Sequence, residues 1–155
     1  MSVTVYSIGH SNRDTDHLVA LLRQHGIQLL ADIRSQPASR YLPHFGRTAL
    51  QRSLPEAGIA YRWLGEALGG KPRAPLPVFS AGIETLLELA AQQPVAMMCA
   101  ERDPAHCHRA HLVTPALLAR GAAVQHIHGD GHLESDADLR RRIAPAPPRQ
   151  PDLFG

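Results

Sequence analysis

The segment 99–109 (CAERDPAHCHR) gathers both cysteines of the chain with side chains that bind anions or transfer protons. It follows an apolar run and precedes a predicted helix, so its residues lie at a strand end and a helix start. A thiol at a helix N-terminus beside cationic side chains forms a stabilised thiolate, which is an effective nucleophile near neutral pH. Cys107 occupies that position, beside His108 and Arg109. Cys99 is either its partner thiol or itself the nucleophile.

Other interpretations of these residues stay open. In one alternative, Cys99 is a buried, small hydrophobic residue at the end of a strand. A zinc site is a second possibility, although the spacing matches no common zinc motif; its ligands would come from Cys99, Cys107, His10 and either His106 or His108. In a third interpretation, His108 and Arg109 anchor the loop to carboxylates such as Asp32 or Glu101. For a cytoplasmic chain we expect reactive, metal-bound or buried thiols rather than a structural disulfide.

A second group of candidates follows another apolar run. Asp32 and Arg34 are two positions apart at the end of a predicted strand, so their side chains point the same way. With Ser39 and Arg40 they could orient a phosphate or a carboxylate, Asp32 fixing an arginine or histidine, or form a structural ion pair. Residues 34–73 carry seven basic side chains against two acids, whereas residues 84–138 carry eight acids against three arginines. The first stretch attracts phosphates or is simply a solvated surface.

Five short apolar runs predict strands at residues 3–8, 28–33, 59–63, 95–99 and 123–127. Helical spacing predicts helices that begin at Asp14 or Thr15, at Arg47, at Ser80 and near Cys107. Residues 34–46 and 64–77 are predicted loops. Pro115 either kinks the last helix or begins a new helix that is capped by Thr114. This alternation predicts an α/β fold, a single three-layer domain with a mostly parallel five-stranded sheet and helices on both faces. Ligands of such sheets bind at the carboxyl ends of the strands.

Composition narrows the class of protein. With 155 residues, a net charge of +2, 44% apolar and 19% charged residues, the chain suits one globular domain, predicted over residues 1–143. A flexible proline-rich tail is predicted over 144–155. No apolar run approaches a membrane span and the N-terminus lacks signal-peptide features, so we expect a cytoplasmic protein without membrane contact. The glycine patterns of dinucleotide sites and phosphate-binding loops, the serine-hydrolase elbow and the tyrosine-phosphatase loop are all missing.

A family resemblance rests on several of these motifs together: residues 8–11 (IGHS), 32–34 (DIR) with Pro37 and Ser39, Tyr61 with 64–65 (LG), 69–70 (GG), 99–101 (CAE) and 107–109 (CHR). In this combination the chain resembles the bacterial and archaeal domain of unknown function 488, from about Thr4 to Ile127. The resemblance implies a compact α/β domain whose shared polar residues gather in one cleft. It implies positions rather than roles, because the family's activity is not established: His10, Asp32, Arg34, Ser39, Cys99, Glu101, Cys107, His108 and Arg109.

The tail resembles a short peptide that docks on the bacterial replication sliding clamp. Residues 150–154 (QPDLF) fit a pattern of Gln, any residue, Ser or Asp, Leu and Phe, in which the last two fill an apolar pocket. Gln150, Asp152, Leu153 and Phe154 are therefore the candidate partner-binding residues.

We therefore expect a thiol-dependent enzyme acting on a phosphate-bearing substrate, plausibly a nucleotide or nucleic acid. Cys99 or Cys107 would be the nucleophile or redox thiol, and Glu101 or a histidine, His10 or His108, would move protons. Arg34, Ser39, Arg40 and Arg109 would bind the anion. The alternative is a non-catalytic DNA-repair or replication accessory protein that docks on the clamp and uses the Cys/His loop as a structural or metal site. A third is a small-molecule thiol or metal handler without a DNA connection.

Overall fold

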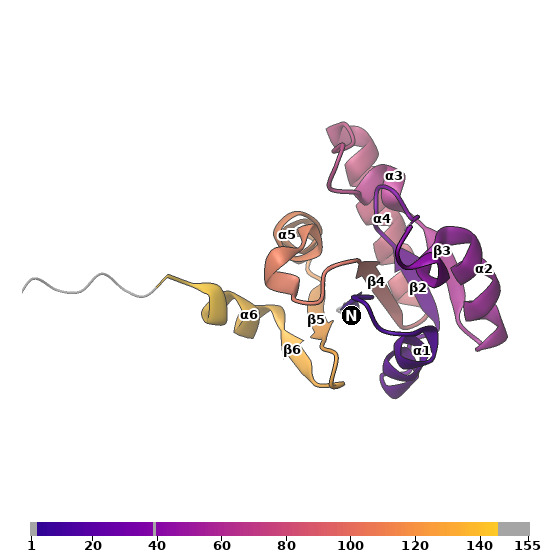
Figure 1. Cartoon of the computed structure of the whole chain (residues 1–155). Coiled ribbons are helices and arrows are strands. Elements are labelled where there is room, and N and C mark those ends of the chain that lie inside the picture. Colours follow the sequence, from indigo (N-terminus) through magenta and orange to yellow (C-terminus); the bar gives the residue numbers. More distant parts are fainter. Residues whose placement is uncertain (1–2, 39, 146–155) are drawn as a thin grey trace, which may run out of the picture.

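The protein is an α/β domain built on one six-stranded sheet (Figure 1). The structure, a computed structural model, describes residues 3–38 and 40–145. The strand order is β3-β2-β4-β1-β5-β6, and every neighbouring pair is parallel except the antiparallel β5 and β6. The strands are β1 (Thr4–Gly9), β2 (Leu29–Asp32), β3 (Ala60–Trp63), β4 (Val95–Cys99), β5 (Ala123–Ile127) and β6 (Leu133–Ser135).

Helices connect most of these strands. The α-helices are α1 (Thr15–Gln24), α2 (Arg47–Glu56), α3 (Gly65–Leu68), α4 (Leu76–Gln92), α5 (Thr114–Ala119) and α6 (Asp136–Ile143). Short helical turns are η1 (Pro43–Phe45), η2 (Pro104–His106) and the π-helical η3 (Arg109–Val113). Within residues 3–38 and 40–145, no helix has the length and apolar character needed to cross a membrane.

Two hydrophobic clusters cover opposite faces of the sheet and make the fold three-layered. Successive residues of a strand point to opposite faces, and β4 shows it: Met97 joins one cluster and Met98 the other. The first cluster packs against α3, α4 and α5 through residues such as Leu68, Ile83 and Leu117. The second packs against α1 and α2 through Leu18, Leu22, Leu50 and Leu54. The predicted helices on both faces are therefore confirmed.

Local signals explain where α1 begins and ends. Asp14 is the N-cap, and its carboxylate accepts a hydrogen bond of 2.8 Å from the backbone N–H of His17. The buried stripe is Leu18, Leu21 and Leu22, and Gly26 follows the helix with φ +68°. This helix covers the sheet directly beyond β1 and sets the path by which the chain leaves that strand.

Several predicted boundaries differ from the structure. The sheet has six strands rather than the predicted five. The sequence did not predict β6 or α6, because β6 contains a single apolar residue and α6 is mostly charged, so neither shows a clear periodic pattern. Helix α4 begins at Leu76 rather than Ser80, since prolines are tolerated in a first turn whose N–H groups need no helical partner. The predicted loop over 64–77 contains the short helix α3 as well as the start of α4.

The segment around Pro115 combines the two alternatives. Helix α5 begins at Thr114 with Pro115 in its first turn, yet it continues without a break from η3. The carbonyl of Arg109 accepts hydrogen bonds from both the backbone N–H and the hydroxyl of Thr114. Since Pro115 has no N–H to close an α-helical turn, the wider π turn before it accommodates the missing donor.

The chain leaves β1 and β4, which are neighbours, toward opposite faces of the sheet. This is the topological switch point at which ligands of α/β sheets bind. Gly9 pairs with Cys99, and the ladder continues past the strands because the His10 N–H donates to the Cys99 carbonyl over 2.9 Å. A β-carbon on Gly9 would lie 1.7 Å from the Glu101 carbonyl oxygen, so only glycine allows this approach.

We predict that Gly9→Ala is far more damaging than Gly58→Ala. At Gly58 (φ +80°) nothing lies within 4 Å of an added β-carbon, so only backbone strain of about 1 to 2 kcal/mol is expected. At Gly9 the backbone of the 99–102 loop must move, and we expect a loss of about 3 kcal/mol or more. Urea unfolding monitored by circular dichroism measures both; equal losses would show that the approach of β1 to this loop is unimportant.

Candidate functional site

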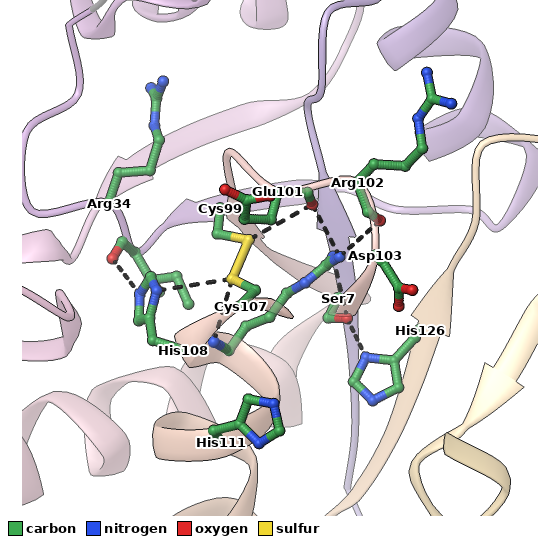
Figure 2. The surroundings of a disulfide bond; sticks show 12 residues. Ser7, Arg34, Cys99, Glu101, Arg102, Asp103, Cys107, His108, His111 and His126 are labelled. Carbon is green, nitrogen blue, oxygen red and sulfur yellow. Dashed lines mark hydrogen bonds between the residues drawn. A yellow bond between two sulfur atoms is a disulfide. The ribbon is translucent and has the colours of Figure 1, made fainter. Parts of the chain in front are cut away.

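The two cysteines are bonded to each other as a disulfide (Figure 2). The sequence favoured reactive, metal-bound or buried thiols over a structural disulfide; the structure pairs the two cysteines, and their reactivity stays a prediction. The reason for the pairing is the path of residues 99–107, which turn back through η2 and bring Cys107 over the end of β4. Asp103 stabilises the turn, because its carboxylate accepts a 3.0 Å hydrogen bond from the Ala105 N–H.

The buried guanidinium of Arg109 holds this loop in place. Its Nη2 donates to the carbonyl oxygens of Glu101 and Arg102, both at 3.1 Å, and its Nη1 lies 3.5 Å from the Ser7 hydroxyl. The side chain is 0% exposed, and Nε has no partner among the described residues. Burial lowers the pKa of Arg109 to about 10, so the group is still cationic at neutral pH. Its described contacts all lie within the protein, and an anion-binding role stays a prediction.

A chain of buried polar groups continues from Arg109. Ser7 lies 2.5 Å from Nδ1 of His126, and Nε2 of His126 lies 3.1 Å from the Asp136 carboxylate. Because a carboxylate only accepts, Nε2 carries the proton and Nδ1 accepts from the serine hydroxyl. These residue types match a Ser-His-Asp triad, yet Ser7 and His126 are 0% exposed. The set therefore supports Arg109 and offers no substrate access.

His108 lies beside Cys107 with a defined tautomer. Its Nε2 is 3.0 Å from the carbonyl oxygen of Ile33, which only accepts, so Nε2 is protonated. Its Nδ1 lies 3.7 Å from Sγ of Cys107. Burial lowers the pKa of His108, with a smaller contribution from the charge of Arg109. At neutral pH this imidazole is neutral and directs an unprotonated nitrogen at the sulfur.

The two sulfur atoms have different surroundings. Sγ of Cys107 also accepts a 3.4 Å hydrogen bond from the Arg109 backbone N–H, which favours a negative charge on this sulfur. Sγ of Cys99 instead lies 3.8 Å from the Glu101 carbonyl oxygen, an acceptor that favours the protonated thiol. The Glu101 carboxylate is exposed at the rim, and no described residue pairs with it.

Asp32 and Arg34 form a buried, bidentate ion pair at the end of β2. The guanidinium donates to the two carboxylate oxygens over 2.8 and 2.7 Å and also to the Phe45 carbonyl. Tyr61 donates to the same carboxylate, and burial followed by this hydrogen bond raises its pKa. Figure 2 shows the Arg34 side chain directed away from the sulfur atoms. Both the ion-pair and the anion-binding interpretations of Arg34 were predicted; the ion pair is present.

His10 is a buried neutral histidine near the same edge. Its Nδ1 donates to the Ser11 carbonyl over 2.7 Å, and its ring packs on Phe45 with centroids 4.6 Å apart. The pKa of His10 is lowered to about 4, and burial is the largest of several contributions to this shift.

A pocket of about 320 Å³ opens beside the disulfide, which we call the cysteine pocket. It is lined by Arg34, Ser35, Gln36, Gly70, Lys71, Cys99, Ala100, Glu101, His106, Cys107 and His108. Five predicted site residues meet there: Cys99, Cys107, Glu101, His108 and Arg34. Three further predicted residues are buried and do not line the pocket: His10, Asp32 and Arg109. Arg40 is an exposed loop residue without a described partner. Ser39, Gln150, Asp152, Leu153 and Phe154 are outside the described residues.

Lys71 was not among the predicted site residues, although the preceding glycine pair was a signal. A β-carbon on Gly69 would lie 2.1 Å from the Ser35 hydroxyl, and one on Gly70 would lie 3.2 Å from the His108 ring. The glycines therefore let this loop lie directly against the pocket, where the Lys71 N–H donates to the Ser35 hydroxyl over 3.1 Å.

The zinc hypothesis stays a prediction. In the part of the chain that the structure describes, no three His, Cys, Asp or Glu side chains are grouped so that they could hold a metal ion. The cysteine sulfurs are directed at each other.

Comparison with known proteins gives one match. A family model described as "Domain of unknown function DUF488" matches residues 14–76 and 73–115. No curated protein and no solved structure matches. The match spans β2, β3 and β4 with the cysteine pocket, so the site belongs to the part of the chain that the family model covers.

We predict that acid destabilises the fold between about pH 6.5 and 4. Burial lowers the pKa of His10 to about 4 and also lowers the pKa values of His108 and His126. The unfolded chain binds protons at these groups below about pH 6.5 and the folded chain does not, so stability falls as pH falls. Asp103 and Glu134, whose pKa values are lowered to about 2, lose their contribution at lower pH.

Urea unfolding at several pH values tests this. In His10→Asn the fall between pH 7 and 4 should be smaller by about 3 kcal/mol, since each pKa unit corresponds to about 1.4 kcal/mol. The exposed His111 provides the control, and His111→Gln should follow the wild-type curve. Parallel curves for wild type and His10→Asn would contradict the prediction.

Proposed function

Because the chain belongs to the DUF488 family, whose description states no activity, we propose from the site itself that the protein is a thiol-dependent enzyme. In this proposal Cys107 attacks the substrate, His108 accepts its proton and Cys99 resolves the covalent intermediate. The observation that supports it most is the unprotonated Nδ1 of His108, 3.7 Å from Sγ of Cys107 and fixed by the Ile33 carbonyl.

The different surroundings of the two sulfurs support the division of roles. Cys107 has a backbone N–H donor and a neighbouring base, whereas Cys99 has a carbonyl acceptor. A thiolate is the attacking form, so the cysteine whose negative charge is stabilised attacks first. Cys99 is close enough to bond to Cys107, which is what a resolving thiol must do.

The reaction we propose is thiol–disulfide exchange, which uses both cysteines. Starting from the dithiol, His108 takes the Cys107 proton and the thiolate attacks one sulfur of a substrate disulfide. The other substrate sulfur leaves with that proton, and a mixed disulfide remains on Cys107. The Cys99 thiol then loses its proton and attacks Sγ of Cys107, and the second substrate thiol departs with that proton. The protein is oxidised by two electrons to the Cys99–Cys107 disulfide, and two molecules of a small thiol restore the dithiol.

A phosphate-bearing substrate is the second part of the proposal. Lys71 lines the cysteine pocket and belongs to the basic stretch of residues 34–73, whereas the Arg34 guanidinium is already paired with Asp32. Cationic side chains at the rim favour an anionic substrate. Glu101 lies on the same rim and opposes this effect, so the anion must bind on the side of Lys71.

We predict that Cys107 of the reduced protein is alkylated by iodoacetamide at pH 7 at least about tenfold faster than Cys99. Cys99→Ser should keep the fast reaction, and Cys107→Ser should leave only the slow one. His108→Asn should slow alkylation of Cys107, whereas His25→Asn, at the C-cap of α1 and outside the cysteine pocket, should not. Mass spectrometry of the labelled peptides measures all four variants.

Glutathione disulfide tests the two-step reaction. Wild type should release two molecules of glutathione and close its own disulfide, while Cys99→Ser should stop at a mixed disulfide on Cys107. If Cys107→Ser traps glutathione on Cys99 equally well, the assignment of roles is wrong. If no variant traps it, the exchange reaction is rejected.

The C-terminal residues 150–154 favour a second candidate function, docking on the bacterial sliding clamp. Removing residues 150–155 should weaken binding to the purified clamp by at least about tenfold, because the Leu153 and Phe154 side chains are expected to fill its apolar pocket. Leu153→Ala with Phe154→Ala should have the same effect, and Arg149→Ala should not. Surface plasmon resonance makes the comparison, and unchanged affinity in the truncated protein would remove this function.

A further inference from the structure

A second hollow lies on the other side of the 99–102 loop and takes no part in the thiol chemistry. It has a volume of about 510 Å³ and lies at the carboxyl ends of β1 and β5. We call it the arginine hollow, after Arg13 and Arg102 in its lining. Its other charged or titratable lining residues are His17, His128, Asp130 and His132.

Arg13 is a partly buried cation without a carboxylate partner in the described chain. Its Nε donates to the His10 carbonyl over 2.9 Å, and Nη1 is buried without any partner there. The backbone of Gly129 packs over the guanidinium, since a β-carbon on Gly129 would lie 3.4 Å from Nη1. Because Nη1 is enclosed, a ligand oxygen would reach this guanidinium at Nη2, for which no hydrogen-bond partner is described either.

Arg102 brings a second guanidinium to the same hollow. It is held by neutral oxygens only, the Ser11 hydroxyl at 3.3 Å from Nε and the Asn12 side-chain oxygen at 3.5 Å from Nη2. Figure 2 shows this side chain directed away from the disulfide. Burial and then the positive charge of Arg102 lower the pKa of Arg13, so the two cations are close enough to repel each other.

The acids near the hollow bind partners other than Arg13 and Arg102. Asp130 accepts from the ring and the backbone N–H of His132, at 2.5 and 3.0 Å. Asp103 pairs with Arg142, and Glu134 pairs with Arg142 and His128. No described carboxylate therefore forms an ion pair with Arg13 or Arg102, although the exposed Asp130 carboxylate lies in the same hollow.

We propose that the arginine hollow binds the phosphate group of a small phosphate monoester. Guanidinium groups bind phosphate through paired N–H donors, and two of them match the charge of a dianion better than that of a single carboxylate. A volume of about 510 Å³ is larger than a phosphate ion requires and is typical of sites for small organic ligands. The ligand therefore carries an organic part beside its phosphate.

This binding does not depend on the thiol reaction. The two pockets are nevertheless neighbours, because Ala100 and Glu101 line the cysteine pocket and Arg102 lines the arginine hollow. The 99–102 loop thus separates the two pockets.

Isothermal titration calorimetry with three probes tests the proposal: inorganic phosphate, ribose 5-phosphate and adenosine monophosphate. We expect saturable binding of at least one organic monoester, tighter than that of inorganic phosphate. Arg13→Gln and Arg102→Gln should each weaken it by about tenfold or more, which is the loss of one charge-assisted contact. Arg52→Gln removes the same charge from the exposed face of α2 and should leave binding unchanged.

The outcomes separate this inference from the proposed function. Cys107→Ser abolishes the exchange reaction and should keep phosphate-monoester binding at wild-type affinity. Circular dichroism checks that Arg13→Gln is folded, and Arg102→Gln gives an independent reading, because its side chain is exposed. Binding that is absent for all three probes, or that Arg52→Gln weakens as much as Arg102→Gln does, would overturn the proposal.

Discussion

The cation of Arg109, enclosed by the protein without a carboxylate directly against it, is the constraint on which the functional edge depends. A desolvated guanidinium needs acceptors, and it takes them from the carbonyls of Glu101 and Arg102 and from Ser7. Ser7 is in turn held by His126 and Asp136. The loop after β4 therefore cannot relax outward without leaving a buried charge unsolvated. That rigidity is what keeps Cys107 against Cys99 on one side and Arg102 over the second hollow on the other.

Two glycines determine how closely neighbouring segments approach each other at the site. Gly9 and Gly69 each lie where a β-carbon would collide with a neighbouring segment, respectively the Glu101 carbonyl and the Ser35 side chain. The first lets the β4 loop lie on β1, and the second lets the Lys71 loop lie on the pocket. Both glycines were visible in the sequence, but what they approach depends on the tertiary fold.

The sequence predicted β4, β5 and α2 with their observed bounds, because β4 is a fully apolar run, Gly121 ends the helix before β5, and Gly58 follows α2. It also placed Cys99, Glu101, Cys107 and His108 at one edge, since parallel strands share the direction of their carboxyl ends. It could not show that Arg109 is buried, because residue type alone favours an exposed anion-binding arginine. The pairing of the two cysteines could not be decided from the sequence for a similar reason, since the compartment argument says nothing about the path of residues 99–107. Residues 133–143 lack a periodic pattern, so the sequence predicts neither β6 nor α6.

The position of β4 in the sheet has a consequence for how the chain folds. β1 has no neighbour that is close in sequence, since its partners are β4 and β5, and the pairing of Ile8 with Met98 joins residues ninety positions apart. Among the strands of the described residues, the parallel pair that lies before β4 in the chain is β2 with β3. A nascent chain that ends before β4 therefore exposes both edges of β1, and loop closure over long separations limits the folding rate. The two halves of the edge that carries the site meet only when β4 lies between β1 and β2, so a fragment lacking β4 is expected not to hold them together.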